Sequence, residues 1–135
     1  MLTVAARADA SAIQRVLIVD DEPDIRLIAE LSLRRVGGWE VASAGSGGEA
    51  LALAASFRPD VILLDVMMPT MDGPMTLRRL RQQPALAAVP VIFITARAQR
   101  HEVARYREVG AVGVIVKPFD PMSLPGEIRR LVGGA

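Results

Sequence analysis

The amino-acid sequence predicts an α/β fold in which a parallel, doubly wound sheet of five strands carries one helix after each strand. Two observations support this prediction. Five short apolar runs recur along the chain, and each gap between them holds one segment whose apolar residues have helical spacing. The run over residues 61–64 contains four consecutive aliphatic side chains, which is typical of a strand buried on both faces of a parallel sheet. Alternating strands and helices form such sheets through right-handed crossovers.

The composition of the 135 residues indicates one folded domain and excludes several kinds of site. Hydrophobic residues make up 51% of the chain, and the net charge of +1 gives no reason to expect nucleic acid or a membrane surface as a partner. Cysteine is absent and His101 is the one histidine, which excludes disulfides and metal sites built from thiolates or several imidazoles. Without a long apolar run or a signal-peptide pattern, the chain is expected to be cytoplasmic.

The strands are predicted from short apolar runs that are rich in β-branched residues. They cover residues 15–20, 39–44, 61–65, 90–95 and 113–117. The second run only alternates apolar and polar residues, so it is the weakest of the five. Residues 1–14, which have no clear period, are interpreted as a flexible leader before a domain over residues 15–135.

The first two helices have recognisable start signals. Pro23, with acidic residues around it, favours the first turn of a helix that ends at Gly37. Ser46 and Glu49 have the spacing of a capping box, so a second helix is expected to start there and to reach about Phe57.

The last three helices follow the third, fourth and fifth strands. Asp72 is expected to cap the third helix, and the fourth runs to about Val109. The last helix is predicted to open at Asp120 and Pro121. Its second turn would then contain a proline and a glycine at 125–126, which predicts either a later start or a kink.

Polar or charged side chains follow or end four of the five strands: Asp20 with Asp21, Asp65, Thr95 and Lys117. In open α/β sheets, ligands bind outside the carboxyl ends of the strands. In the flavodoxin-like strand order 2-1-3-4-5, the first, third and fourth strands are neighbours, so all of these groups would face one crevice.

The chemistry of these side chains favours a metal-assisted transfer of a phosphoryl group. Three nearby carboxylates repel each other, and a hard cation such as Mg²⁺, bound by oxygen ligands, would offset that repulsion. Beside a cation, Asp65 could serve as a nucleophile and form an acyl phosphate, while Thr95 and Lys117 would meet the charge of the phosphoryl oxygens. Each residue alone also fits an ordinary role as a helix cap, a strand former or a surface charge.

Four motifs resemble the receiver domain of two-component response regulators, in particular a stand-alone, chemotaxis-regulator-like one. They are VLIVDDEPDIR, VILLDVMMPTMDG, VIFITA and VIVKPFDP, and together they extend over about residues 15–132. The resemblance implies that Asp65 accepts a phosphoryl group from a sensor histidine kinase or a phosphotransfer protein. It also implies that Asp20 and Asp21 hold Mg²⁺ together with Asp65 and the backbone carbonyl of Met67.

The resemblance assigns roles to the last two strand ends and also has one departure. Thr95 matches the hydroxyl that moves toward the phosphoryl group, and Lys117 matches its ion-pair partner. The bond between Lys117 and Pro118 matches one that is cis in the family. Relatives often carry Tyr or Phe three residues before the lysine, a ring that swings inward on phosphorylation. Val114 stands there, so the usual aromatic switch is missing.

The leading hypothesis is therefore a stand-alone, Mg²⁺-dependent phosphoacceptor switch, which is no enzyme beyond its own phosphorylation and dephosphorylation. It would act on a downstream protein through the face of the fourth helix, fifth strand and last helix, as a monomer or weak homodimer. A phosphorylation-independent scaffold and a phosphorelay intermediate are the alternatives. A phosphohydrolase is disfavoured because Asp65 lacks a second acid two residues on, and DNA binding because no helix-turn-helix segment follows.

Overall fold

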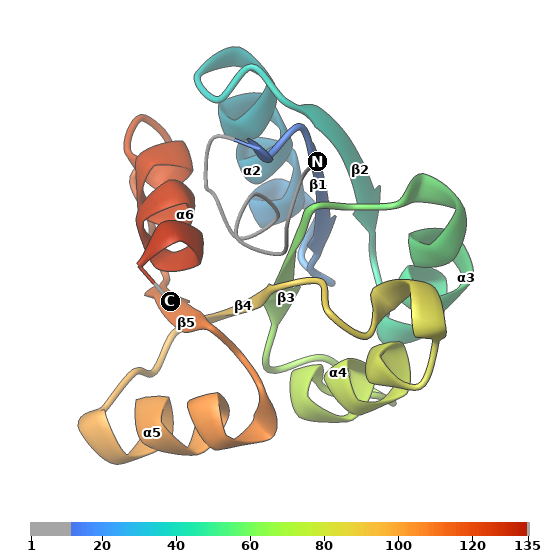
Figure 1. Cartoon of the computed structure of the whole chain (residues 1–135). Helices are drawn as coiled ribbons and strands as arrows, with labels where there is room; N and C mark the ends of the chain where they lie inside the picture. Colours follow the sequence, from blue (N-terminus) through green and yellow to red (C-terminus); the bar gives the residue numbers. More distant parts are fainter. Residues whose placement is uncertain (1–11, 135) are drawn as a thin grey trace.

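Five parallel strands form the central sheet of the computed structural model, which describes residues 12–134 (Figure 1). The strands are β1 (Arg15–Val19), β2 (Glu40–Ala44), β3 (Val61–Asp65), β4 (Val91–Thr95) and β5 (Gly113–Val116). Their order in the sheet is β2-β1-β3-β4-β5, with every neighbouring pair parallel. This confirms the predicted doubly wound sheet and its strand order, and it makes β1, β3 and β4 direct neighbours.

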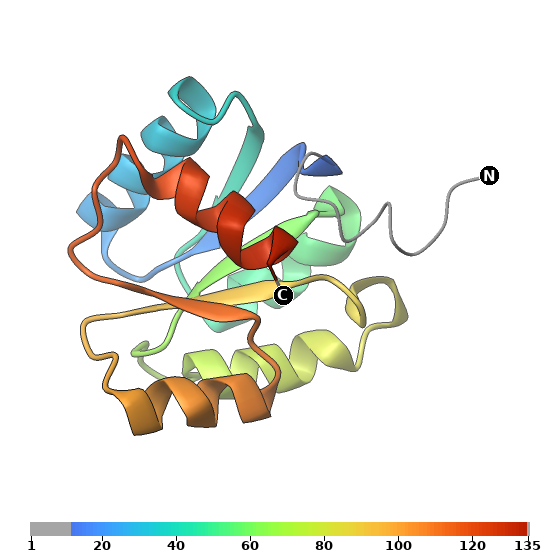
Figure 2. The same ribbon diagram turned by 60° about the vertical axis from the view of Figure 1, so that its left-hand side comes forward.

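Helices cover both faces of the sheet. They are α2 (Pro23–Arg35), α3 (Gly47–Phe57), α4 (Gly73–Arg81), α5 (Arg100–Val109) and α6 (Leu124–Gly133), with a short 3₁₀ helix η2 (Pro84–Leu86) that was not predicted. The helices α2 and α6 cover one face, while α3, α4 and α5 cover the other. Figure 2 shows α4 and α5 side by side under the sheet, with α6 above it.

Alternating side chains of the inner strands supply two hydrophobic cores. Leu17 and Val19 of β1 pack toward α3, α4 and α5, while Val16 and Ile18 pack toward α2 and α6. Successive side chains of a strand point to opposite faces, so a strand of the sheet interior needs apolar residues at every position. All five residues of β3 are buried, which explains its continuous aliphatic run.

Side chains near the helix starts confirm the predicted caps Ser46 and Asp72 and correct one bond of the predicted capping box. Ser46 Oγ accepts a hydrogen bond from the Glu49 amide at 3.1 Å, and Asp72 Oδ1 accepts one from the Met75 amide at 2.9 Å. The Glu49 carboxylate accepts from the Gly45 amide at 2.6 Å rather than from Ser46. Only one of the two bonds of the predicted capping box therefore forms.

The last helix starts later than its first acidic residue suggested. The predicted opening at Asp120 and Pro121 is wrong, because Asp120 Oδ1 instead accepts a hydrogen bond from the Met122 amide at 2.9 Å and forms a turn. Helix α6 begins at Leu124, which confirms the alternative of a late start. Pro125 then lies in the first turn, where its missing N–H has no intrahelical partner to lose.

Residues 1–11 of the predicted leader lie outside the described residues. The residues that follow already contact the domain: Ile13 is buried in the core beneath α2 and α6, and the Gln14 amide donates to Asp60 Oδ2 at 2.9 Å. The boundary between leader and domain at Arg15 stays a prediction. Over residues 12–134, no helix has the length and apolar character needed to cross a membrane.

Candidate functional site

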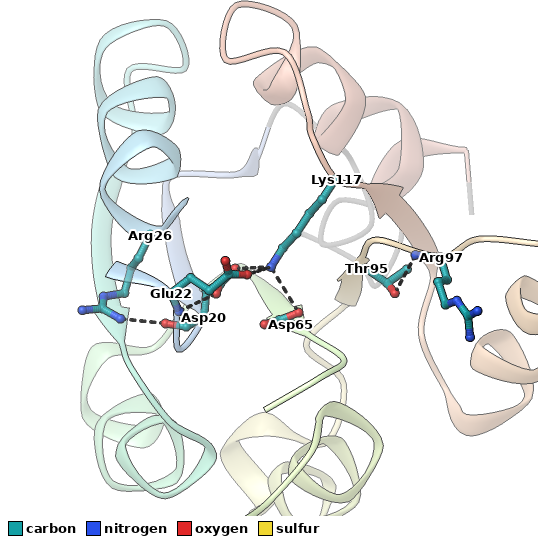
Figure 3. A network of polar contacts seen from close by, with 7 residues as sticks. All are labelled: Asp20, Glu22, Arg26, Asp65, Thr95, Arg97 and Lys117. Carbon is teal, nitrogen blue, oxygen red and sulfur yellow. Dashed lines mark hydrogen bonds and ion pairs between the residues drawn. The ribbon is translucent and has the colours of Figure 1, made fainter. Parts of the chain in front are cut away.

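The predicted site residues gather at the carboxyl edge of the sheet. Asp20 directly follows β1, Asp65 ends β3, Thr95 ends β4 and Lys117 directly follows β5. Because all five strands are parallel, these ends share one edge. Figure 3 shows the Lys117 side chain extending from the end of β5 toward Asp20 and Asp65.

Three carboxylates form the acidic part of the site. Asp20, Asp21 and Asp65 each offer one oxygen atom, and these atoms lie within 4.8 Å of one another. Asp20 and Asp65 are buried, whereas Asp21 is partly exposed. The turn after β1 fixes Asp20, since its Oδ1 accepts from the Glu22 amide at 2.9 Å and its backbone carbonyl accepts from the Arg26 guanidinium at 2.7 Å.

The pKa of Asp65 is raised from 3.8 to about 7. Burial is the largest cause, and the negative charge of Asp20 adds to it, while the Lys117 ammonium acts in the opposite direction. Burial disfavours the charged form of a carboxyl group because it removes water from around that charge. A bound cation would favour the ionised, nucleophilic form.

Lys117 is the cation of the site and contacts three carboxylates. Its Nζ lies 2.9 Å from Asp20 Oδ2, 3.0 Å from Glu22 Oε1 and 3.4 Å from Asp65 Oδ1. Burial would lower the pKa of Lys117, but the contacts with Asp20 and Glu22 outweigh burial and raise it above its ordinary value. Lys117 is therefore held as an ammonium ion.

Glu22 is the member of this network that the sequence did not predict. It is 95 residues from Lys117 along the chain, and its place at the start of a helix offered an ordinary explanation for its charge. The signal that was available is its position directly after Asp20 and Asp21.

Thr95 belongs to a separate contact in this structure. Its hydroxyl is buried and accepts a hydrogen bond from the Arg97 amide at 3.1 Å (Figure 3). In the sheet, Asp65 pairs with Ile94, the residue before Thr95, so the two side chains stand on neighbouring strands at nearly the same level. The peptide bond between Lys117 and Pro118 is cis, as the resemblance implied.

Val114 lies three residues before Lys117, at the position of the usual aromatic switch. Val114 is half-buried and packs against the core beneath α3, α4 and α5. In that core the rings of Phe93 and Tyr106 meet edge to face, with centroids 5.2 Å apart, so an aromatic pair from β4 and α5 lies in this core too.

The Met67 side chain is 76% exposed in the loop after β3. A role of its backbone carbonyl as a metal ligand stays a prediction.

The loop after β3 is closed tightly over the end of that strand. The Gly73 amide donates to the Val66 carbonyl at 2.9 Å. A Cβ atom at position 73 would lie only 2.7 Å from the Asp65 carbonyl oxygen, so this position requires glycine. The loop therefore fixes the backbone of Asp65 as well as covering it.

The donor set of the site fits a hard divalent cation. Asp20 Oδ2 is buried, and although Lys117 Nζ lies nearby, no donor among residues 12–134 makes a well-directed hydrogen bond to this oxygen. Three clustered carboxylates with a single ammonium leave a negative excess. Carboxylate and carbonyl oxygens are the ligands that Mg²⁺ prefers. A nucleophilic carboxylate beside such a cation and an ammonium is suited to accepting a phosphoryl group.

Comparisons with known proteins agree with this geometry. Residues 16–129 match the family model described as the response regulator receiver domain. Among curated relatives, the response regulator PleD of Caulobacter vibrioides is 42% identical over 119 residues, which cover 87% of this chain and 26% of that protein. The probable transcriptional regulator ycf27 of Cyanophora paradoxa is 38% identical over 88% of this chain and 48% of that one. The chain thus spans less than half the length of these relatives.

Solved structures with the same fold include proteins of similar length. The chemotaxis protein CheY4 of Vibrio cholerae superposes with a TM-score of 0.82 at 37% identity, over 89% of this chain and 99% of that one. A putative response regulator from Chloroflexus aurantiacus gives a TM-score of 0.79 at 33% identity, over 89% of this chain and 98% of that one.

Proposed function

Because the chain belongs to the response regulator receiver domain family of two-component signalling, we propose that it is a stand-alone phosphoacceptor switch that uses Mg²⁺. Receiver domains are signalling domains rather than enzymes, so the only chemistry proposed is phosphorylation and dephosphorylation of this chain itself. The observation that carries the proposal is the place of Asp65. It is a buried carboxylate with two further aspartates and one ammonium around it.

The proposed metal ligands are Asp20, Asp21, Asp65 and the backbone carbonyl of Met67. The unsatisfied Asp20 Oδ2 and the cluster of three carboxylate oxygens support this assignment. When bound, Mg²⁺ would offset the charge of the carboxylates and of the phosphoryl oxygens.

In the proposed reaction, a carboxylate oxygen of Asp65 attacks the phosphorus atom of a phosphohistidine on a sensor kinase or phosphotransfer protein. The new O–P bond forms as the N–P bond breaks, and the electron pair of the N–P bond leaves with the imidazole. Lys117 meets one phosphoryl oxygen with its ammonium. Thr95 donates a hydrogen bond from its hydroxyl to another oxygen, and because this hydroxyl only accepts from the Arg97 amide, its own proton is available for that bond.

The proposed output surface is the face formed by α5, β5 and α6, which a downstream protein would bind. Thr95 ends β4, which neighbours this face, and Lys117 directly follows β5, which is part of it, so both residues lie beside the proposed surface. We further propose that residues 15–135 form the receiver domain, that it acts in the cytoplasm as a monomer or weak homodimer, and that relay of the phosphoryl group to another protein is the alternative output.

The phosphoacceptor role is tested by incubating the protein with acetyl phosphate and Mg²⁺ and measuring its intact mass. The wild type should gain the mass of one phosphoryl group, and Asp65→Asn should gain none. Asp24→Asn, which changes an exposed carboxylate at the start of α2, is the matched control and should gain as much as the wild type. No gain in the wild type, or an equal gain in Asp65→Asn, would show that the proposal is wrong.

A phosphorylation-independent scaffold is the second candidate, because Val114 replaces the usual aromatic switch residue. Backbone amide NMR spectra with and without beryllofluoride, a phosphoryl mimic, separate the two. The switch predicts chemical-shift changes that extend over α5, β5 and α6. Changes confined to the strand ends around Asp65 would favour the scaffold.

A further inference from the structure

The Lys117 ammonium is held by a carboxylate outside the proposed metal site. Among its three contacts, the one with Glu22 Oε1 at 3.0 Å has the geometry of a directed hydrogen bond, and the one with Asp65 Oδ1 at 3.4 Å is the longest (Figure 3). Asp20 makes the remaining contact, at 2.9 Å. Lys117 is therefore bound more closely on the α2 side of the site than on the side of the phosphoacceptor.

The position of Glu22 leaves its carboxylate available for Lys117. Glu22 occupies the N-cap position of α2, but its side chain makes no capping hydrogen bond to the helix. Its backbone amide is already satisfied by Asp20 Oδ1. The Glu22 side chain is 59% exposed, whereas that of Lys117 is only 12% exposed, so Glu22 lies on the solvent side of the ammonium.

A bound cation would affect Glu22 differently from Asp20 and Asp65, the other two carboxylates that contact Lys117. Asp20 and Asp65 belong to the cluster of oxygens that could hold a metal ion, together with Asp21, and Glu22 does not. A cation at that cluster would compete with Lys117 for Asp20 and Asp65. The contact with Glu22 would persist, because its carboxylate is not a member of the cluster.

We propose that Glu22 is a positioning residue that restrains Lys117 in the unphosphorylated protein and so limits how readily the ammonium turns to a phosphoryl group on Asp65. An ammonium has three N–H donors in fixed directions, and a donor engaged with Glu22 must be released or shared to reach a new acceptor. The inference rests on the phosphoacceptor function proposed above. It adds a residue that sets the balance between the free and phosphorylated states without touching the phosphoryl group.

The test compares Glu22→Gln with Asp24→Asn at saturating Mg²⁺, with beryllofluoride as the probe. Both variants remove one negative charge from the start of α2, but Asp24 is exposed and has no ion pair or side-chain hydrogen bond among residues 12–134. Because partly exposed ion pairs are weak, Glu22→Gln should bind beryllofluoride about two- to fivefold more tightly than the wild type. Asp24→Asn should bind it like the wild type.

A second measurement needs neither metal nor phosphoryl mimic. Lys117 is the only lysine of the chain, so acylation by an acetyl N-hydroxysuccinimide ester in EDTA, followed by peptide mass analysis, reports on its Nζ alone. Glu22→Gln removes the charge that holds this ammonium on its solvent side, so Nζ can turn more freely toward the reagent. Acylation should be severalfold faster in Glu22→Gln than in the wild type or Asp24→Asn.

The outcomes separate this inference from the function on which it rests. Acylation of Glu22→Gln at the wild-type rate would mean that the contact is absent in solution, and the inference would be wrong. Faster acylation with unchanged beryllofluoride affinity, or a gain in affinity that Asp24→Asn matches, would also overturn it. If the wild type itself binds no beryllofluoride, the phosphoacceptor function fails and this inference fails with it, whatever the acylation rates show.

Discussion

The backbone amide of Lys117 donates a hydrogen bond to the carbonyl oxygen of Thr95 at 2.8 Å. This bond joins the residue that ends β4 to the residue that follows β5. The two side chains nevertheless point to different partners, since Thr95 accepts from the Arg97 amide and Lys117 pairs with carboxylates. Their backbones are therefore joined at the ends of β4 and β5, while their side chains have different partners.

The Thr95 hydroxyl should contribute to the binding of a phosphoryl mimic at Asp65. Thr95→Ala should lower the affinity for beryllofluoride about tenfold at saturating Mg²⁺, because a hydrogen bond to a charged group is lost. Thr95→Ser keeps the hydroxyl and should stay within about threefold of the wild type. Titrations followed by NMR measure both affinities, and equal binding by wild type and Thr95→Ala would remove Thr95 from the site.

Asp65 should make the metal-free protein less stable as the pH rises. Below about pH 4 the carboxyl group is protonated in both folded and unfolded states and has no effect. Between pH 4 and 7 the unfolded state ionises while the folded state, with a pKa of about 7, keeps its proton, so stability falls; above pH 7 the full loss remains. Asp65→Asn should therefore be more stable than the wild type at pH 8, by about 2–4 kcal/mol.

Urea unfolding in EDTA at pH 5 and pH 8 measures this difference. At pH 5 the extra stability of Asp65→Asn over the wild type should be less than half of its value at pH 8. At pH 5 the wild type has lost only part of the stability that it loses between pH 4 and pH 7. Asp24→Asn is the control, since its carboxylate is exposed, and it should show no such pH dependence. An equal advantage for Asp65→Asn at both pH values would contradict the raised pKa.

Binding of Mg²⁺ should weaken as the pH falls. Protons and metal compete for Asp65, whose pKa of about 7 places the competition between pH 6 and 8. From this pKa, affinity at pH 6 is expected to be about tenfold lower than at pH 8. Isothermal titration calorimetry measures the affinity, and Asp65→Asn should bind Mg²⁺ weakly with little dependence on pH. Affinity that is the same at both pH values in the wild type would exclude Asp65 as a ligand.

Gly73 should be intolerant of a side chain. A Cβ atom there would lie 2.7 Å from the Asp65 carbonyl oxygen and 2.9 Å from Val66 Cα, both of them backbone atoms that cannot turn away. We expect Gly73→Ala to lower the free energy of unfolding by about 1–3 kcal/mol and to weaken phosphorylation by displacing Asp65.

The matched control for this substitution is Gly126→Ala. It introduces the same methyl group into the exposed side of α6, where nothing lies within 4 Å, and should stabilise the protein by about 0.5–1 kcal/mol. Urea unfolding of both variants compares them directly. If Gly73→Ala were as stable as the wild type, the loop would not be packed against β3 as described.

The sequence was sufficient for the sheet and for the residues at its edge, because both depend on local patterns. The buried run of β3 and the polar residue that ends it are adjacent in the chain, and parallel topology places such ends together. The partners of individual side chains were harder to predict. The contact of Glu22 with Lys117 joins two ends of the chain, and no local pattern encodes it.

Helix starts show the same limit at shorter range. Asp120 had the residue type of a helix cap, but its carboxylate forms a turn instead, and α6 begins only at Leu124. Glu49 had the spacing of a capping box, yet its side chain reaches the amide of Gly45 rather than that of Ser46. In both cases the carboxylate accepts a hydrogen bond from a nearby backbone amide. The bond at Asp120 does not start a helix, and the bond at Glu49 comes from a different amide than predicted, because several nearby amides compete for one carboxylate.

Because β3 is buried on both faces, substitutions are tolerated less well in this strand than at exposed positions of the loops around it. A shift of Asp65 would disturb two hydrophobic cores at once, because its strand packs against helices on either side. The Asp65 carboxylate is thus a fixed reference point, and under the proposed function the timing of the signal would be tuned by residues in the surrounding loops. Exposed loop residues such as Met67 can change without disturbing either core, so the surroundings of Asp65 can be altered while the strand that carries it stays in place.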